Sequence, residues 1–294
     1  MSKELIFDME TSDPDDFLTL LFLLGRTDIN LKAVTITPGT PDQIGLIQTA
    51  LSWFAKKIPV GAYDLKYPKS CVSSWHYTVF GNITPSLDAI EGSEVLIQYC
   101  DENTTLLTGA PLKNLGNAIR INENRGGGLL QIGHWVAQGG FAGEGVVPQE
   151  KQLSKFKGKT TCPTYNLGKD PESAHLALNF DGIKVKRFVS KNVCHGVYYD
   201  ANLHKQLEKV KNQHLAFELI WKAMEHYLKK HPAGKKFHDP LAACCAINEK
   251  IGTWKEVELY QKQREWGSRL CPNSNTWIII DYDQETFIQT FLGI

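Results

Sequence analysis

The sequence lacks an excess of charge of either sign. Its 294 residues include 32 lysines and arginines and 32 aspartates and glutamates, so the formal net charge at pH 7 is zero. Proteins that bind nucleic acid through a general positive field carry a basic excess, because the phosphate backbone supplies much of the affinity. We therefore expect no nucleic-acid partner for this chain.

Long apolar runs, a secretory leader and metal-site cysteine spacings are also missing. The apolar run at 17–24 is far shorter than the ~20 residues of a membrane span. Residues 1–4 lead directly into an apolar strand pattern and not into the apolar region of a signal peptide. The seven cysteines are expected to be reduced, mostly buried thiols. These absences predict a cytoplasmic protein with no membrane partner.

The sequence does contain a regular alternation of strand and helix patterns. Hydrophobic residues make up 42% and charged residues 22% of the chain, which is enough for a sizeable core. Apolar strand patterns at 31–37, 104–108 and 130–138 are separated by helical segments and tight turns. This alternation predicts βαβ units. Because we find no repeat and no linker, we expect a single domain over residues 1–294. Its predicted fold is Rossmann-like α/β, with an open, mainly parallel sheet flanked by helices.

An acidic turn follows the first apolar run. Five carboxylates fall within nine residues, namely Asp8, Glu10, Asp13, Asp15 and Asp16. Ligands of open α/β sheets bind at the carboxyl ends of strands, and crowded carboxylates repel one another unless a cation neutralises them. Oxygen ligands suit a hard ion such as Ca²⁺ or Mg²⁺. Capping of the next helix by Asp13 and Asp15 explains at most two of the acids. We therefore predict a metal site.

Two later turns carry further candidates. After strand 104–108, Gly109 permits a bend at which a backbone carbonyl can face a cation, although an ordinary strand-to-helix turn is the alternative. Further along, His238 and Asp239 stand side by side at an apparent helix start. Histidine suits proton transfer near neutral pH, whereas the alternative reading makes Asp239 a helix cap.

Two long irregular segments complete the pattern. Residues 63–83 are aromatic and include Trp75 and His76, and loops of this length are usually functional or mobile. Residues 141–163 are rich in glycine and lysine and have no long hydrophobic periodicity, which predicts a loop or lid.

Four motifs in chain order resemble those of the inosine–uridine-preferring nucleoside hydrolase family. They are the acidic first turn, the Thr-Gly-x-Pro-Leu-x-Asn turn at 108–114, the Tyr-Asn…Asp-Pro-Glu segment at 165–172 and the His-Asp-Pro at 238–240. Their order and approximate spacing fit over essentially the whole chain. The resemblance implies a mainly parallel α/β fold, a Ca²⁺ ion deep in the active site and cleavage of the N-glycosidic bond of nucleosides by water. It also implies a homo-oligomer, either a dimer or a tetramer.

The resemblance carries roles to individual residues of this chain. The implied metal ligands are the carboxylates of Glu10, Asp16 and Asp239 and the carbonyl of Thr108. Asp15 matches the aspartate that holds the ribose hydroxyls, and Asn166 matches the ribose-binding asparagine. His238 matches a histidine that helps to protonate the leaving base. His76 lies near another base-side histidine. Asp8 or Glu10 would act as the base that activates water.

The chain also departs from the family pattern. The family has Asp-x-Asp where this chain has Asp8-x-Glu10, and one extra residue precedes Asp15. Thr164 takes the place of a ribose-binding glutamate that would repel a 5′-phosphate. Lysines lie nearby, and we expect Lys155, Lys157 and Lys159, with Lys235 and Lys236, to contact a phosphate.

The predicted function is Ca²⁺-dependent hydrolysis of a ribonucleoside or its 5′-monophosphate, which releases the free base and ribose or ribose phosphate for salvage. Two alternatives remain at this stage. A haloacid-dehalogenase-type phosphatase also places acids after its first strand, but it needs an aspartate where Glu10 stands. A nucleoside-binding protein on the same scaffold, with little or no turnover, is the second alternative.

Overall fold

The central sheet of the computed structural model, which describes residues 2–293, has eleven strands in the order β4-β3-β2-β1-β5-β6-β8-β13-β11-β12-β7. Eight strands are parallel: β1 (Lys3–Met9), β2 (Ile29–Ile36), β3 (Val60–Ala62), β4 (Ile90–Glu91), β5 (Thr105–Thr108), β6 (Ile132–Gln138), β8 (Ile183–Val189) and β13 (Thr276–Tyr282). Three strands at one edge are antiparallel: β11 (Gly252–Lys262), β12 (Glu265–Leu270) and β7 (Thr161–Cys162). The predicted open, mainly parallel α/β sheet is therefore confirmed.

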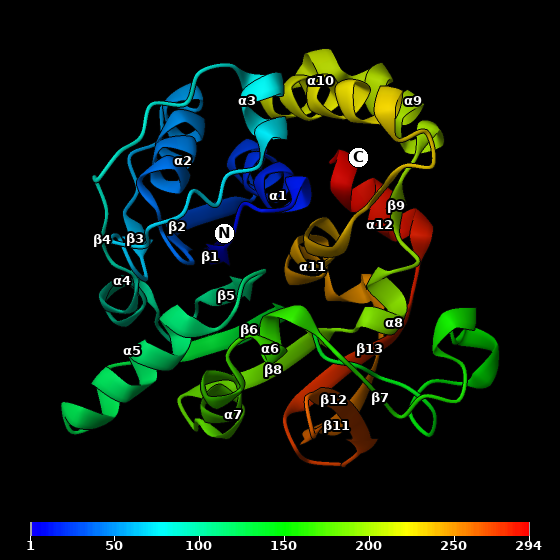
Figure 1. Cartoon of the computed structure of the whole chain (residues 1–294). Coiled ribbons are helices and arrows are strands. Elements are labelled where there is room, and N and C mark those ends of the chain that lie inside the picture. The colour runs from blue at the N-terminus through cyan, green and yellow to red at the C-terminus, as the bar shows by residue number, and fades with distance from the viewer. Residues whose placement is uncertain (1, 294) are drawn as a thin grey trace.

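Helices cover both faces of this sheet (Figure 1). On one face lie α1 (Pro14–Gly25), α2 (Pro41–Trp53), α3 (Ser74–Phe80), α9 (Ala201–Val210), α10 (Leu215–Lys230), α11 (His238–Ile247) and α12 (Gln284–Leu292). On the other face lie α4 (Gly92–Tyr99), α5 (Lys113–Asn124) and α7 (Pro171–Asn179). The one-domain assignment of residues 1–294 stays a prediction, with Met1 and Ile294 outside the described residues.

Short elements fill the connections. They are α6 (Tyr165–Gly168), α8 (Lys191–Cys194), the two-stranded ribbon of β9 (Tyr198–Tyr199) and β10 (Lys235–Lys236), and the 3₁₀ turns η1 (Gln149–Lys151), η2 (Ser154–Phe156), η3 (Lys211–Gln213) and η4 (Glu249–Ile251). Within residues 2–293, none of the helices combines the length and the apolar character that crossing a bilayer would require.

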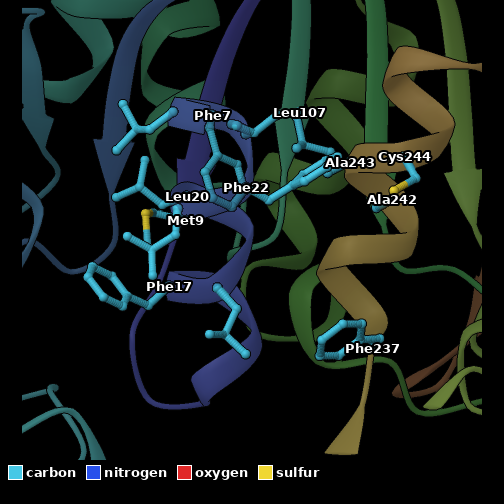
Figure 2. Packing of buried hydrophobic residues seen from close by; sticks show 14 of the residues in the cluster. Phe7, Met9, Phe17, Leu20, Phe22, Leu107, Phe237, Ala242, Ala243 and Cys244 are labelled. Carbon is cyan, nitrogen blue, oxygen red and sulfur yellow. The ribbon is translucent and has the colours of Figure 1, made fainter. Parts of the chain in front are cut away.

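Strand β1 shows why the core lies on both faces of the sheet. Its residues Leu5, Ile6 and Phe7 are fully buried, as is usual for a strand with a neighbour on each side and helices above and below. Successive side chains point to opposite faces, so Phe7 packs in the cluster under α1 and α11, while Ile6 packs in the cluster under α4 and α5. Figure 2 shows Phe7 and Leu107 of β5 at the top of the view, with Phe22 of α1 and Ala243 of α11 just below them.

The two segments predicted to be irregular, 63–83 and 141–163, contain more ordered structure than the sequence indicates. Most of the aromatic residues at 75–80 belong to helix α3, and this helix packs on the core cluster that contains Phe17. The segment 141–163 is tied to α8, because Asn192 donates to the carbonyl of Ala142 (3.1 Å) and accepts from the backbone of Leu153 (3.0 Å). Phe141 and Phe156 stack edge to face beneath it. These contacts pack the segment on α8, and its predicted role as a loop or lid stays a prediction.

We predict that Gly116→Ala in α5 destabilises the protein. A Cβ atom at this position would lie 2.0 Å from the Ser173 hydroxyl oxygen and 3.1 Å from the Ser173 Cα atom on α7. Overpacking of this kind costs about 1–3 kcal/mol, which outweighs the about 1 kcal/mol that alanine gains over glycine within a helix. Urea unfolding should show a lower free energy of unfolding for this variant.

Gly168→Ala is the matched control, because a Cβ atom at Gly168 of α6 meets no atom within 4 Å. It should leave the unfolding free energy within about 0.5 kcal/mol of the native value. A Gly116→Ala protein as stable as the native protein would show that α5 and α7 do not need this close approach.

Candidate active site

A cavity of about 310 Å³ opens at the carboxyl ends of β1, β5 and β6, where α11 begins. Its lining residues are Glu10, Ser12, Asp13, Asp15, Asp16, Gly109, Gln138, Tyr165, Asn166, His238 and Asp239. Six predicted site residues are among them: Glu10, Asp15, Asp16, Asn166, His238 and Asp239. The carboxyl edge of the parallel strands thus gathers side chains that are up to 229 positions apart in the chain.

Asp15 fixes how α1 and α11 meet. Its Oδ2 atom accepts hydrogen bonds from the backbone N–H groups of His238 (3.0 Å) and Asp239 (3.3 Å). These are N–H groups of the first turn of α11, which has no side-chain cap of its own. Asp15 therefore caps a helix that begins more than 220 residues later, and this cap brings Asp239 to the acidic turn.

Gly109 makes room for the approach of Asp239. A Cβ atom at Gly109 would lie 2.5 Å from Asp239 Oδ1 and 3.3 Å from Asp16 Oδ1. Carboxylate oxygens of Asp15, Asp16 and Asp239 lie within 4.8 Å of one another. The glycine after β5 therefore allows three buried carboxylates to converge.

The electrostatics of this cluster favour a cation. Burial raises the pKa of Asp16 well above its usual value, and the neighbouring Asp239 and Glu10 raise it further. Burial likewise raises the pKa of Asp239, with Asp15 and Glu10 adding to the effect. Within residues 2–293, Asp239 Oδ1 is buried and has no hydrogen-bond partner. An all-oxygen donor set with an unpaired buried oxygen fits a hard cation such as Ca²⁺ or Mg²⁺.

A lysine already neutralises part of the acidic turn. Lys235 on β10 is only 5% exposed, and its Nζ atom lies 2.9 Å from Asp13 Oδ1 and 3.0 Å from Asp15 Oδ1. Its ammonium is therefore taken up by carboxylates and does not serve the phosphate contact that the sequence suggested. Glu10, Asp16 and Asp239 remain without a cation, and they are the three carboxylates of the predicted ligand set.

Asp8 and Glu10 occupy different environments. Asp8 is fully buried and accepts hydrogen bonds from Thr35 (2.7 Å) and Asn114 (2.8 Å), and burial raises its pKa to about 6. It does not line the cavity, whereas Glu10 does. Glu10 Oε2 accepts a hydrogen bond of 2.5 Å from the hydroxyl of Ser12, within the turn that is one residue longer than the family pattern.

The fourth predicted ligand, Thr108, ends β5 next to Gly109. Its hydroxyl oxygen accepts a hydrogen bond of 2.9 Å from Trp135 Nε1, and the residue is buried. The side chain of Thr108 is therefore held by the core. The predicted metal ligand is its backbone carbonyl, which this contact does not involve.

The wall around Asn166 and His238 contains residues that the sequence did not reveal. Asn166 Nδ2 donates to the side-chain oxygen of Gln138 at 2.8 Å. His238 stacks on His195, with ring centroids 4.8 Å apart. Gln138 ends a predicted strand, so its position at the carboxyl edge of the sheet could have identified it as a site residue. His195 belongs to no motif, and only the fold brings it to His238.

Besides Asp8 and Thr108, four further predicted residues are not among the lining residues of the cavity. His76 is fully buried beside Phe17, where burial lowers its pKa to about 4. Thr164 is buried next to the lining residue Tyr165. Lys157 and Lys159 are exposed on the 141–163 segment and do not line the cavity.

Comparison with known proteins identifies the family. The sequence model of the inosine-uridine preferring nucleoside hydrolases matches residues 5–289. An uncharacterized protein of Aquifex aeolicus (strain VF5) is 28% identical over 293 residues, or 95% of each chain.

Solved structures of nucleoside hydrolases share the fold. An inosine-guanosine nucleoside hydrolase has a TM-score of 0.72 at 18% identity, and a plant nucleoside hydrolase has 0.71 at 17%; each comparison covers 99% of this chain and 98% of the other. A purine-preferring ribonucleoside hydrolase from Gardnerella vaginalis has a TM-score of 0.70 at 15% identity, over 99% and 97% of the two chains. The chain belongs to the inosine-uridine preferring nucleoside hydrolase family, whose members are N-glycosidases that cleave nucleosides.

Proposed function

We propose that this enzyme hydrolyses the N-glycosidic bond of a ribonucleoside or its 5′-monophosphate with the help of a bound Ca²⁺ ion. The observation that carries the proposal is the convergence of the half-buried Glu10 with the buried Asp16 and Asp239, none of them paired with a lysine or arginine in residues 2–293, in one cavity with Asn166 and His238. The free base and the ribose or ribose phosphate that are released would feed nucleobase salvage. A cytoplasmic homo-oligomer stays part of the same proposal.

Glu10, Asp16, Asp239 and the Thr108 carbonyl would hold the ion. Ca²⁺ accepts six to eight oxygen ligands in flexible geometry, which suits a glutamate in place of an aspartate. When bound, the ion polarises a water molecule and the ribose hydroxyls. Asp15, which α11 and Lys235 hold in place, would accept a hydrogen bond from a ribose hydroxyl. Asn166, which Gln138 orients, would bind the sugar from the facing wall.

The reaction breaks the bond between C1′ and the base nitrogen and forms a bond from C1′ to a water oxygen. The sugar passes through an oxocarbenium-like transition state. We assign the proton of the attacking water to Glu10, because this carboxylate faces the cavity while Asp8 is bonded to Thr35 and Asn114 behind it. His238 would act as the acid that helps to protonate the departing base and so stabilises the negative charge that develops on it.

We predict that Asp239→Asn removes most of the response to Ca²⁺. Ca²⁺ at 100 times its Kd should stabilise the native protein by about 2.7 kcal/mol, if it binds only the folded state. This stabilisation raises the Tm of the native protein when Ca²⁺ is added, and the Tm of the variant should rise little. Base release from a nucleoside panel should fall at least about 100-fold, since a bound ion supplies several kcal/mol of transition-state stabilisation. Mg²⁺ should give a smaller shift than Ca²⁺ in the native protein, because it demands stricter octahedral geometry.

The metal-free proteins provide the control for folding. Without Ca²⁺, Asp239→Asn removes a buried charge that faces Asp15 and Glu10, so this variant should be at least as stable as the native protein. Full turnover and a full Ca²⁺-dependent Tm shift in Asp239→Asn would refute the assigned metal site.

We predict that His238→Ala slows hydrolysis selectively for substrates with poor leaving groups. A natural nucleoside needs help at the departing base, and donation by a positioned side chain contributes about 10²–10⁴-fold. A p-nitrophenyl riboside leaves as a stable anion and should lose less than about tenfold in kcat. An equal fall in kcat for the nucleoside and the p-nitrophenyl riboside would show that His238 does not assist the departing base. His231→Ala, exposed beyond the end of α10, serves as the control and should leave both rates unchanged.

A further inference from the structure

Three lysines around His195 have no carboxylate partner within the described part of the chain. Lys155 Nζ lies 2.7 Å from His195 Nδ1, and Lys191 Nζ donates to the carbonyl of Pro163 at 2.7 Å. Lys236 is the third, two residues before His238. Other lysines, such as Lys151, Lys184 and Lys235, pair with carboxylates. We call Lys155, Lys191 and Lys236 the lysine cluster.

The charges of the lysine cluster act on one another. The pKa of Lys155 is lowered first by burial and then by the charges of Lys236 and Lys191. The same lysines, after burial and His238, help to hold the pKa of His195 at about 3. Like charges held together without a counter-charge cost stability, and an anion that binds among them would remove this cost.

The cluster borders the catalytic cavity. Lys155 contacts His195, and His195 stacks on the lining residue His238. On its other side, Lys191 bonds to the residue before Thr164. The Thr164 side chain is 6% exposed, and its hydroxyl finds no hydrogen-bond partner in residues 2–293. These groups lie behind the lining residues His238 and Tyr165, so a ligand that extends from the cavity past these two residues would meet two kinds of polar group.

A soft metal ion fits this place less well than an anion. Cys194, His195 and His238 do offer ligand atoms within 4.8 Å of one another. However, Lys155 occupies the Nδ1 lone pair of His195, and the positive charges of Lys236 and Lys191 also act on this ring. Because Nδ1 accepts from an ammonium, Nε2 of the neutral ring carries its hydrogen and becomes another donor. The wall is thus rich in donors and poor in free acceptors.

We propose that the lysine cluster, with the His195 ring and the Thr164 hydroxyl, binds the phosphate of a nucleoside 5′-monophosphate. This assignment rests on the proposed function, which places the 2′- and 3′-hydroxyls at the acidic cluster and leaves the 5′ carbon for the facing wall. A phosphate carries about −1.5 to −2 charges, so the carboxylates repel it while lysines bind it as point charges. Lys155 and Lys236 of the sequence-based hypothesis are thus kept and Lys191 is added, while Lys157, Lys159 and the carboxylate-bound Lys235 are left out.

The test measures binding without relying on turnover. Isothermal titration of the Ca²⁺-loaded protein would compare ribose 5-phosphate, ribose and inorganic phosphate. The variants are Lys155→Ala, Lys191→Ala and Lys155→Arg, with Lys209→Ala on the exposed side of α9 as the control. The same proteins are then assayed for kcat/KM on a nucleoside, its 5′-monophosphate and a nucleoside with a carboxylated base.

We expect ribose 5-phosphate to bind at least tenfold more tightly than ribose. Each alanine variant should lose about tenfold or more of its affinity for ribose 5-phosphate, as expected for a lost charge-assisted hydrogen bond. Ribose binding should change by less than about threefold, Lys155→Arg should recover most of the affinity, and Lys209→Ala should match the native protein. kcat/KM for the monophosphate should follow the same order.

Several results would overturn the assignment. Equal affinities for ribose and ribose 5-phosphate would remove the phosphate site, as would equal losses on both ligands in the lysine variants. If inorganic phosphate binds as tightly as ribose 5-phosphate, the lysine cluster is a site for a free anion and not for a substrate phosphate. If kcat/KM is higher for the nucleoside with a carboxylated base, the lysine cluster binds an anionic group on the base. Lysine-dependent binding of ribose 5-phosphate without cleavage of any substrate would instead reject the proposed function and leave the phosphate site standing.

Discussion

The interaction on which the site depends is the capping of α11 by Asp15. One carboxylate oxygen accepts the first N–H groups of this helix, and the other is bound by Lys235. The helix dipole and the ammonium both stabilise the negative charge of this buried group. Three segments from distant parts of the chain, the starts of α1 and α11 and the strand β10, are thereby locked together. Asp239, His238 and the carboxylates of the first turn can share one cavity because of this contact.

The charges around the cavity are segregated, with carboxylates on one side and lysines on the other. Five carboxylates gather on one side, where Lys235 neutralises two of them and the other three form the proposed cation site. Lysines without carboxylate partners stand behind the His195–His238 wall. A neutral chain with formal net charge zero thus holds strong local charges of both signs. Under the proposed function, such an arrangement would orient a substrate whose hydroxyls bind carboxylates and whose anionic group binds lysines.

The departures from the family pattern are supported by their local structure. The longer side chain of Glu10 is held by the hydroxyl of Ser12, and its backbone N–H bonds to Asp16 at 3.2 Å. Asp8 remains on the strand but is turned toward Thr35 and Asn114, where it ties β1 to β2 and to the start of α5. The carboxylate that faces the cavity is therefore that of Glu10, two residues after Asp8. The substituted glutamate keeps an acid in the cavity lining together with Asp16 and Asp239.

Sequence periodicity alone determined the parallel sheet, the acidic turn at its carboxyl edge and the helix start at His238, because strand alternation and helix capping are local properties. The chain order of four motifs then indicated the family. Only the tertiary structure decided which charges meet. Lys235 and Lys236 are adjacent in sequence, yet one is buried between carboxylates and the other has no carboxylate partner in residues 2–293. His76 entered the aromatic core, and His195 reached His238, because packing of distant segments selects such contacts and no local pattern encodes them.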